Sequence, residues 1–212
     1  MEIIKVENIT KQFSDKFVLR NFSFVVNEKD KINISGPSGI GKTTLFRLLL
    51  GFETPDEGKI YFENAELSEE KIWEVRKKVA YVSQDLSIGH GKVSTFFNET
   101  LNYKANIHQK GKTDIEKERL FKLFELPDSI LNKNIEELSG GEKQRVAIIN
   151  ALLLGRTIFF LDEVSSALDI KLKKTVLDFF LCHPDFTVLY ISHDNYLPEN
   201  SNVRILKLAN DE

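Results

Sequence analysis

The sequence predicts an α/β fold into which a helical segment is inserted, and three observations predict it. Short apolar runs rich in β-branched and aromatic residues occupy both ends of the chain, and such runs indicate strands. Near the carboxyl end a helical pattern lies between two of these runs, an order typical of a parallel sheet with right-handed crossovers. Residues from about 85 to 155 instead show helical patterns and few strand signals.

The expected elements follow this alternation of apolar runs and helical patterns. The predicted strands are Ile3–Val6, Phe17–Leu19, Phe22–Val26, Lys31–Ser35, one within Thr54–Asn64, Val79–Ser83, Thr157–Leu161 and Thr187–Ser192. The predicted helices are Lys42–Leu50, Thr95–Tyr103, Thr113–Phe124, Gly141–Leu154 and Ile170–Leu181. We therefore expect one domain over residues 1–212, with an α/β core of residues 1–84 and 156–212 and a helical subdomain of residues 85–155.

Composition is that of an ordinary globular protein. Of the 212 residues, 42% are hydrophobic and 29% charged, and the formal net charge is −3. This balance gives nucleic acid no electrostatic reason to bind. The single cysteine, Cys182, excludes an intrachain disulfide and is expected to be a buried small hydrophobe.

Targeting and membrane signals are weak. The N-terminal sequence MEIIKVENIT has no basic region followed by an apolar run, so we expect no signal peptide. The best apolar run, Val146–Leu154, is interrupted by Asn150 and falls short of the roughly 18 apolar residues that a spanning helix needs. The chain is expected to be cytoplasmic and soluble by itself, so that any membrane role requires a separate chain.

A glycine-rich loop lies between a predicted strand and a predicted helix. Its residues match the pattern G-x-x-x-x-G-K-[ST] and are Gly36, Pro37, Ser38, Gly39, Ile40, Gly41, Lys42, Thr43 and Thr44. Glycines let backbone N–H groups close on phosphate oxygens, and the helix points its positive end at them. We expect Lys42 to reach the β- and γ-phosphates of a nucleotide and the Thr43 hydroxyl to bind Mg²⁺. A small-molecule kinase would show the same loop, and a chance glycine-rich turn is the structural alternative.

Two acids, Asp162 and Glu163, follow the apolar strand Ile158–Leu161. The carboxyl edge of a parallel sheet is where ligands bind in open α/β folds. We expect Asp162 to hold Mg²⁺ directly or in its second sphere, and Glu163 to polarise the attacking water as a general base. An acidic turn after a strand is common, so the pair gains its meaning from the glycine-rich loop upstream.

The segment Leu138–Glu142 reads LSGGE and discriminates best among the candidate classes. Ser139 and Glu142 have the spacing of a capping box at the start of a helix. Capping does not need Gly140 and Gly141, which expose backbone N–H groups and so indicate a second anion site. One chain then carries two phosphate sites about a hundred residues apart. Both can serve one nucleotide only if they come from different subunits, which predicts a head-to-tail dimer with ATP at its interface.

These motifs, in this order, resemble the ABC ATPase family over essentially the whole chain. Three further residues match family motifs. Gln84, in YVSQD, matches the Q-loop, which contacts Mg²⁺ and water and couples to the membrane partner; Asp169, in SALD, matches the D-loop, which crosses the dimer interface. His193, in ISHD, matches the switch histidine that contacts the γ-phosphate. Phe13 resembles the aromatic that stacks on adenine, although Phe17 is a rival and a packing role is open.

The resemblance implies a P-loop NTPase core with a mostly parallel sheet, an N-terminal antiparallel β subdomain and the inserted helical subdomain. It also implies ATP and Mg²⁺ as ligands, ATP hydrolysis, a second copy as partner, and a separate transmembrane permease at the inner face of the membrane. Two positions depart from the family: Val164-Ser165 stand where Pro-Thr is frequent, and Glu142 where Gln is frequent. Neither departure removes a catalytic group.

One segment resembles a subgroup of the family, and other classes of ATPase remain to be weighed. Leu126–Ile135 is similar to small bacterial ATPases that pair with a separate membrane subunit and are associated with export of metal, specifically iron. The segment Asp85–Tyr103 is expected to receive the permease, where Phe96 and Phe97 form either a docking cleft or helical core.

A metabolic kinase has no use for LSGGE. A non-transport ABC ATPase acting on a soluble or ribosomal partner is the remaining alternative, although such proteins usually carry two cassettes or long coiled coils.

Overall fold

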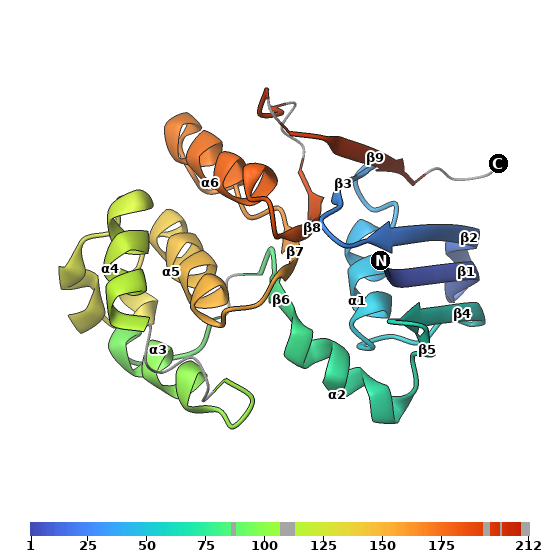
Figure 1. The fold of residues 1–212 in the computed structure, drawn as a ribbon, viewed down its shortest axis with the longest axis horizontal. Helices are drawn as coiled ribbons and strands as arrows, with labels where there is room; N and C mark the ends of the chain where they lie inside the picture. The colour runs from blue at the N-terminus through green and yellow to red at the C-terminus, as the bar shows by residue number, and fades with distance from the viewer. Residues whose placement is uncertain (86–87, 107–112, 193–195, 200, 209–212) are drawn as a thin grey trace.

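The computed structural model describes residues 1–85, 88–106, 113–192, 196–199 and 201–208. Its strands form two sheets, shown in Figure 1. The parallel sheet has the order β6 (Val79–Val82), β7 (Ile158–Asp162), β8 (Thr187–Ile191), β3 (Lys31–Ser35) and β9 (Val203–Lys207). The antiparallel sheet has the order β2 (Lys16–Asn27), β1 (Glu2–Phe13), β4 (Glu57–Phe62) and β5 (Ala65–Glu66). The predicted α/β class is confirmed.

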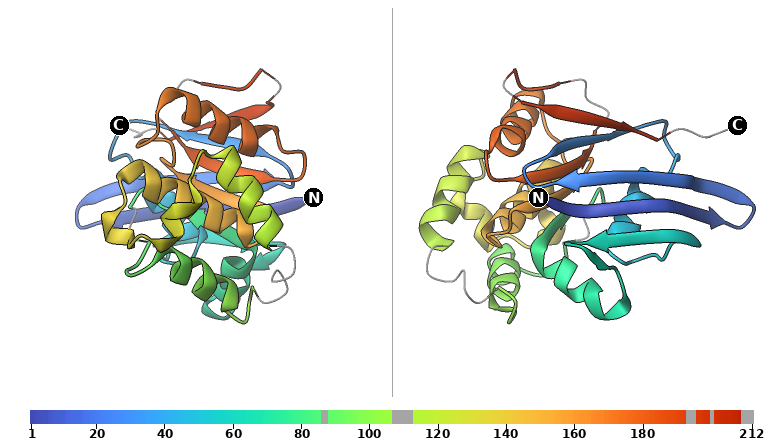
Figure 2. Two further views of the ribbon diagram at one scale, coloured as in Figure 1. Left: turned by 90° about the vertical axis from the view of Figure 1, so that its left-hand side faces the viewer. Right: turned by 45° about the vertical axis from the view of Figure 1, so that its right-hand side comes forward.

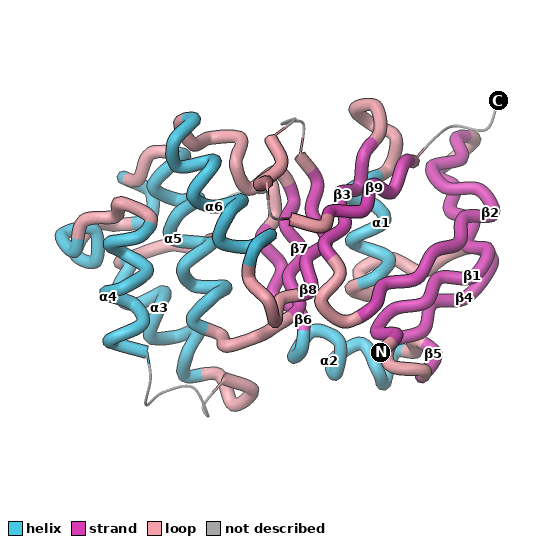
Figure 3. The backbone as a smooth tube through the Cα atoms, turned by 45° about the horizontal axis from the view of Figure 1, so that its top comes forward, coloured by secondary structure: helices cyan, strands magenta, loops and turns pink. Residues whose placement is uncertain are grey.

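Six α-helices and two 3₁₀ helices complete the described part of the chain. They are α1 (Lys42–Leu49), α2 (Glu69–Lys78), α3 (Val93–Asn102), α4 (Thr113–Leu123), η2 (Asp128–Asn132), η3 (Ile135–Glu137), α5 (Gly140–Leu153) and α6 (Ile170–Cys182). Figure 3 shows α3, α4, α5 and α6 gathered on one side of the parallel sheet, with α1 and the antiparallel sheet on the other. Among the described residues, no helix is both long enough and apolar enough to cross a membrane.

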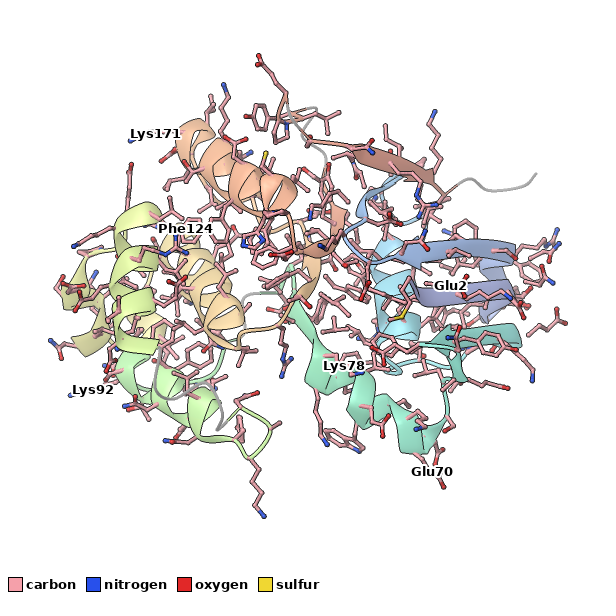
Figure 4. All side chains as sticks on the ribbon, in the orientation of Figure 1. Glu2, Glu70, Lys78, Lys92, Phe124 and Lys171 are labelled. Carbon is pink, nitrogen blue, oxygen red and sulfur yellow. The ribbon has the colours of Figure 1, made fainter. Side chains whose placement is uncertain are left out.

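The parallel sheet separates two hydrophobic cores, because successive side chains of a strand point to opposite faces. In β7, Phe159 belongs to the core shared with the helices of residues 93–182, and Phe160 to the core shared with α1. Phe46 of α1 stacks on Phe160 with ring centroids 5.0 Å apart, a pairing worth about 1 kcal/mol. On the other face, Phe124, labelled in Figure 4, is fully buried and meets Phe179 of α6 edge-on. The strand that ends in Asp162 is therefore held from both sides.

The structure corrects several local expectations. The predicted strands Phe17–Leu19 and Phe22–Val26 form one strand, β2, because a register shift and a positive φ of 45° at Asn21 let pairing with β1 continue through the irregularity. Figure 2 shows this β1–β2 hairpin extending to one side of the molecule. Three elements, α2, β5 and β9, were not predicted, and β9 makes β8 an inner strand of the parallel sheet and not its last.

Cys182 is exposed, so its expected burial was wrong. It is the last residue of α6, whose core-facing residues follow helical spacing through Leu172, Val176, Phe180 and Leu181. At about 100° per residue, position 182 falls on the opposite side of the helix from that stripe. The residue type suggested a buried position, but the helical register placed it at the surface.

Candidate functional site

The glycine-rich loop leads from β3 into α1 and leaves the helix start bare. Gly41 is the N-cap and has a φ of 110°; a Cβ there would lie 2.1 Å from Val18 Cγ1. No other residue fits that position without displacing Val18. The first intrahelical donor is Leu45, whose N–H bonds the Gly41 carbonyl, so the N–H groups of Lys42, Thr43 and Thr44 face out of the helix end. The loop thus presents several backbone donors and a positive helix end to an anion.

The Lys42 side chain lies inside this loop. It is only 7% exposed, and its Nζ donates to the carbonyl oxygens of Gly36 and Pro37 at 3.0 Å each. These two bonds hold an ammonium group among outward-facing N–H groups. The concentration of positive potential is suited to an anion such as a polyphosphate.

Asp162, at the end of β7, is 1% exposed and incompletely bonded. Burial raises its pKa, and a hydrogen bond from Thr43 partly offsets that rise. Tyr81 Oη donates to Asp162 Oδ2 at 3.4 Å, and burial raises the pKa of this phenol, which keeps it protonated. Asp162 Oδ1 is buried and has no hydrogen-bond partner among the described residues. A buried oxygen without a donor is a favourable position for a cation.

The residues around Asp162 fit Mg²⁺. A carboxylate oxygen and the Thr43 hydroxyl are hard oxygen ligands of the kind that Mg²⁺ takes together with substrate phosphates. In the part of the chain that the structure describes, no group of three or more His, Cys, Asp or Glu residues forms a metal cage. A carboxylate and a hydroxyl leave further positions of an octahedral Mg²⁺ for phosphate oxygens and water.

Glu163 and Gln84 meet at the carboxyl edge of the parallel sheet. Gln84 Nε2 donates to Glu163 Oε2 at 2.9 Å, joining the residue after β7 to a residue just after β6. The Glu163 N–H bonds the carbonyl of Ile191, the last residue of β8. Its φ of 51° lies in the left-handed region, which for a side chain of this type costs about 1 kcal/mol or more. The surrounding bonds hold the strained backbone and with it the direction of the carboxylate.

The LSGGE segment forms the predicted capping box at the start of α5. Glu142 N–H donates to Ser139 Oγ at 3.2 Å, and Ser139 N–H donates to Glu142 Oε2 at 2.8 Å. The bond from the Ser139 N–H, followed by one from Lys133, lowers the pKa of Glu142. The first intrahelical donor is Lys143, so the N–H groups of Gly140 and Gly141 face out of the helix end. The second helix start also offers backbone donors to an anion.

Comparison with known proteins shows the family to which the chain belongs. The family model described as ABC transporter matches residues 19–166. This chain belongs to the ABC transporter ATP-binding family. The predicted resemblance is confirmed, and the loop at residues 36–44, the LSGGE segment and the acidic pair take their family names of P-loop, signature and Walker B acids.

Relatives with curated names share this cassette. The spermidine/putrescine import ATP-binding protein PotA of Protochlamydia amoebophila is 34% identical over 200 residues, which cover 92% of this chain and 52% of the relative. The chain thus spans about half the length of that protein. The probable iron export ATP-binding protein FetA of Escherichia coli K12 is 32% identical over 199 residues, covering 91% of this chain and 85% of the relative.

Solved structures confirm the ABC fold. A bacterial Atm1-family ABC exporter with ATP bound matches with a TM-score of 0.83 at 25% identity, over 98% of this chain and 38% of the exporter chain. A dimeric ATP-binding cassette in a post-hydrolysis state, bound to ADP and phosphate, matches with a TM-score of 0.80 at 25% identity. That match covers 97% of this chain and 94% of the cassette.

The D-loop lies against the signature within the same chain. Asp169 caps α6, since its Oδ1 accepts from the Leu172 N–H at 2.9 Å, while Ala167 is exposed. A Cβ on Gly141 would lie 2.9 Å from the Ala167 carbonyl oxygen. The close approach of the D-loop therefore leaves room for no side chain at Gly141.

The remaining predicted residues fall into three situations. Phe13 lies at the tip of the β1–β2 hairpin, 44% exposed and with Lys11 Nζ 5.2 Å from its ring centroid; Phe17 is 40% exposed. Both rings have surface on which a base could stack, so adenine stacking by Phe13 stays a prediction. Phe97 is 2% exposed core, whereas Phe96 lines a cavity of about 270 Å³. His193 lies outside the described residues.

Sequence reasoning gave no role to Tyr81 or Gln144, which the structure brings to the Walker B acids. Gln144 is fully buried, and its Nε2 donates to the Glu163 carbonyl oxygen at 3.2 Å. The signal was present in the sequence: Gln144 is one turn before Ile148 and two turns before Ala151, on a face of α5 that is otherwise apolar. A polar residue in such a register indicates a bonded, buried amide.

Proposed function

We propose that this chain binds Mg·ATP and hydrolyses it as the ATP-binding subunit of a transport system. The observation that carries the proposal is the arrangement at the sheet edge. Glu163 Oε2 accepts a hydrogen bond from Gln84 Nε2 at 2.9 Å. The neighbouring Asp162 has an Oδ1 atom with no hydrogen-bond partner among the described residues. The P-loop follows β3, whose carboxyl end lies at the same edge. This arrangement provides phosphate donors, a magnesium ligand and a base within one site.

Binding follows from the donors of the P-loop. The outward N–H groups and the Lys42 ammonium bind the β- and γ-phosphates, and Thr43 and Asp162 would hold Mg²⁺. The ion, when bound, supplies charge neutralisation on the phosphate oxygens. The ring of Phe13 supplies a stacking surface for adenine. Each of these contacts uses a group that the folded chain already holds in place.

Hydrolysis needs a water molecule in line with the γ-phosphate. Glu163 accepts a proton from that water. The water oxygen forms a bond to phosphorus while the bond from phosphorus to the ADP oxygen breaks. Gln84 fixes the Glu163 carboxylate through its amide N–H. Lys42 stabilises the charge that develops on the phosphate oxygens, and we assign the same role to His193 from the family pattern.

The second anion site requires a second copy of the chain. The N–H groups of Gly140 and Gly141, at the start of α5, would meet the γ-phosphate held by the P-loop of the partner. The dimeric form of the similar ATP-binding cassette supports this arrangement. ATP then joins the two copies, and hydrolysis releases them, so nucleotide biases a two-state equilibrium.

A permease would dock beside the Q-loop. The cavity of about 270 Å³ lies next to Gln84, since Ser83 and Asp85 line it together with Ile88 and Phe96. A segment of a transmembrane partner in this cavity would sense the position of Gln84 and through it Glu163. This contact would place the chain at the inner face of the membrane.

The cargo is proposed from resemblance. The FetA relative carries iron export in its name, and Leu126–Ile135 resembles the corresponding subgroup, so we propose a metal ion such as iron. Other relatives at 33–34% identity are named for polyamine, sulfate or molybdate import. Copurification of the tagged chain from its native cells in mild detergent tests this assignment. A multi-span membrane protein supports transport, whereas a ribosomal partner would support a non-transport ABC ATPase.

The variant Glu163→Gln tests the reaction itself. It should bind ATP with unchanged affinity and lose nearly all hydrolysis, and light scattering should show a stable dimer with Mg·ATP. Glu66→Gln is a matched control, because Glu66 is exposed on β5 and pairs only with a surface lysine among the described residues. Full hydrolysis by Glu163→Gln would exclude Glu163 as the base, and a strictly monomeric state with ATP would count against the head-to-tail pair.

A further inference from the structure

Gln144 joins the signature helix to the segment that carries Glu163. Its side chain is fully buried, and both polar ends of its amide are bonded. Nε2 donates to the Glu163 carbonyl oxygen at 3.2 Å, and Oε1 accepts from the Ala167 N–H at 3.1 Å. One amide therefore spans the turn from the Walker B acid to the D-loop.

The turn itself is tight and strained. The Glu163 carbonyl also accepts from the Ser166 N–H at 3.1 Å, and Glu163 has a φ of 51°. Gly141 packs against the Ala167 carbonyl, so the same helix contacts the turn at two points, one helical turn apart. A non-glycine residue stays in the left-handed region only where its surroundings enforce it.

We infer that Gln144 is a positioning residue for hydrolysis: it fixes the main chain of Glu163 and so aims the carboxylate. The inference rests on the proposed ATPase function. Gln144 has no need to touch nucleotide or water, because it acts through Glu163. If the amide is removed, the Ala167 N–H loses its acceptor and the Glu163 carbonyl loses a donor, and the turn can relax.

A purely structural role makes a different prediction. A buried glutamine that only stabilises the fold would, when replaced, lower the unfolding temperature without changing turnover per folded molecule. Asn106 provides the matched control, because its buried amide also bonds on both sides, through Nδ2 to the Thr100 carbonyl and through Oδ1 to Arg156. Asn106→Leu should therefore reproduce the loss of stability alone.

The test compares Gln144→Leu with Asn106→Leu by steady-state kinetics and amide exchange. We expect kcat of Gln144→Leu to fall roughly 10- to 100-fold, because small displacements of a catalytic group are costly, with KM and ATP affinity changed less than about threefold. The peptide containing Ala167 should exchange its amide protons faster than in the unmodified chain. Asn106→Leu should keep kcat. Unchanged kcat in Gln144→Leu, or a parallel loss of ATP affinity, overturns the inference.

A double substitution gives a second readout. In the Glu163→Gln background, Gln144→Leu should cause no further loss of hydrolysis, because residues that act as a unit are not additive. Independent, multiplicative losses overturn the inference. If Gln144→Leu does not fold, Gln144→Met keeps the length of the side chain while removing both hydrogen bonds, and the same reduced kcat is expected. An inactive unmodified chain refutes the proposed function and this inference together, whereas an active chain with a neutral Gln144 variant refutes the inference alone.

Discussion

Two helix starts in this molecule are proposed to face phosphate, and they differ in their N-caps. The start of α1 has Gly41 as its cap, so no side chain satisfies the outward N–H groups, and the Lys42 ammonium lies beside them. The start of α5 has Ser139 as its cap, and Glu142 returns to the Ser139 N–H. One start is positively charged and open, and the other is capped and carries a carboxylate.

The difference indicates the order in which the two sites meet the nucleotide. The capping box and the Lys133 ion pair at 3.1 Å fix the signature segment within the isolated chain and neutralise the Glu142 charge. The P-loop instead concentrates positive charge that only an anion relieves. We therefore expect ATP to bind first at the P-loop, and the signature of the partner to close on it as a preformed surface.

The largest effect should come from removing the charge at the open start. Lys42→Ala should weaken ATP binding by at least about 100-fold, since several charge-assisted hydrogen bonds of roughly 1.5–3 kcal/mol each are lost. Titration with a fluorescent ATP analogue measures this. Lys59→Ala, which removes a lysine at the exposed ion pair with Glu66, should bind normally. Unchanged affinity in Lys42→Ala would refute the phosphate-cradle assignment.

Alanine substitutions of the glycines at the two helix starts should have the next largest effect. Gly41→Ala places a Cβ 2.1 Å from Val18 at a φ of 110°, so we expect a loss of roughly 2–4 kcal/mol in unfolding free energy together with weaker ATP binding. In Gly140→Ala the new Cβ lies 3.6 Å from the Ala167 side chain, an ordinary contact, and stability should change by less than about 1 kcal/mol. Urea unfolding distinguishes the two. Adding Val18→Ala should restore part of the Gly41→Ala loss, and no recovery would show that backbone strain dominates.

Local sequence patterns were sufficient to predict the elements that depend on neighbouring residues alone. β3 and the start of α1 fall where predicted, because a β-branched run, glycines and a lysine leave few alternatives. The capping box at Ser139 was likewise predictable from spacing alone. The resemblance to a family then supplied the order of the motifs around the site.

Contacts between distant segments were not predictable in this way. β9 has no buried residue, unlike β7 and β8, and its pairing with β3 depends on tertiary contacts. Gln144 lies 19 residues before Glu163, and nothing local shows that its amide bonds that carbonyl. Helix α2 has few apolar residues, with Val75 buried, so its periodic signal is faint. Such features follow from packing, which sequence periodicity does not report.

The smallest expected effect is the pH dependence of stability that Glu142 contributes at the start of α5. Because its folded-state pKa is lowered, Glu142 contributes stability that is complete above its ordinary pKa of 4.5 and is lost as pH falls through the lower folded-state value. Glu142→Gln keeps an oxygen that accepts from the Ser139 N–H but removes both the titration and the charge opposite Lys133. Urea unfolding should therefore show a smaller fall in unfolding free energy below pH 4.5 for this variant than for the unmodified chain. Identical pH profiles would mean that the carboxylate contributes no more than the amide to the capping box.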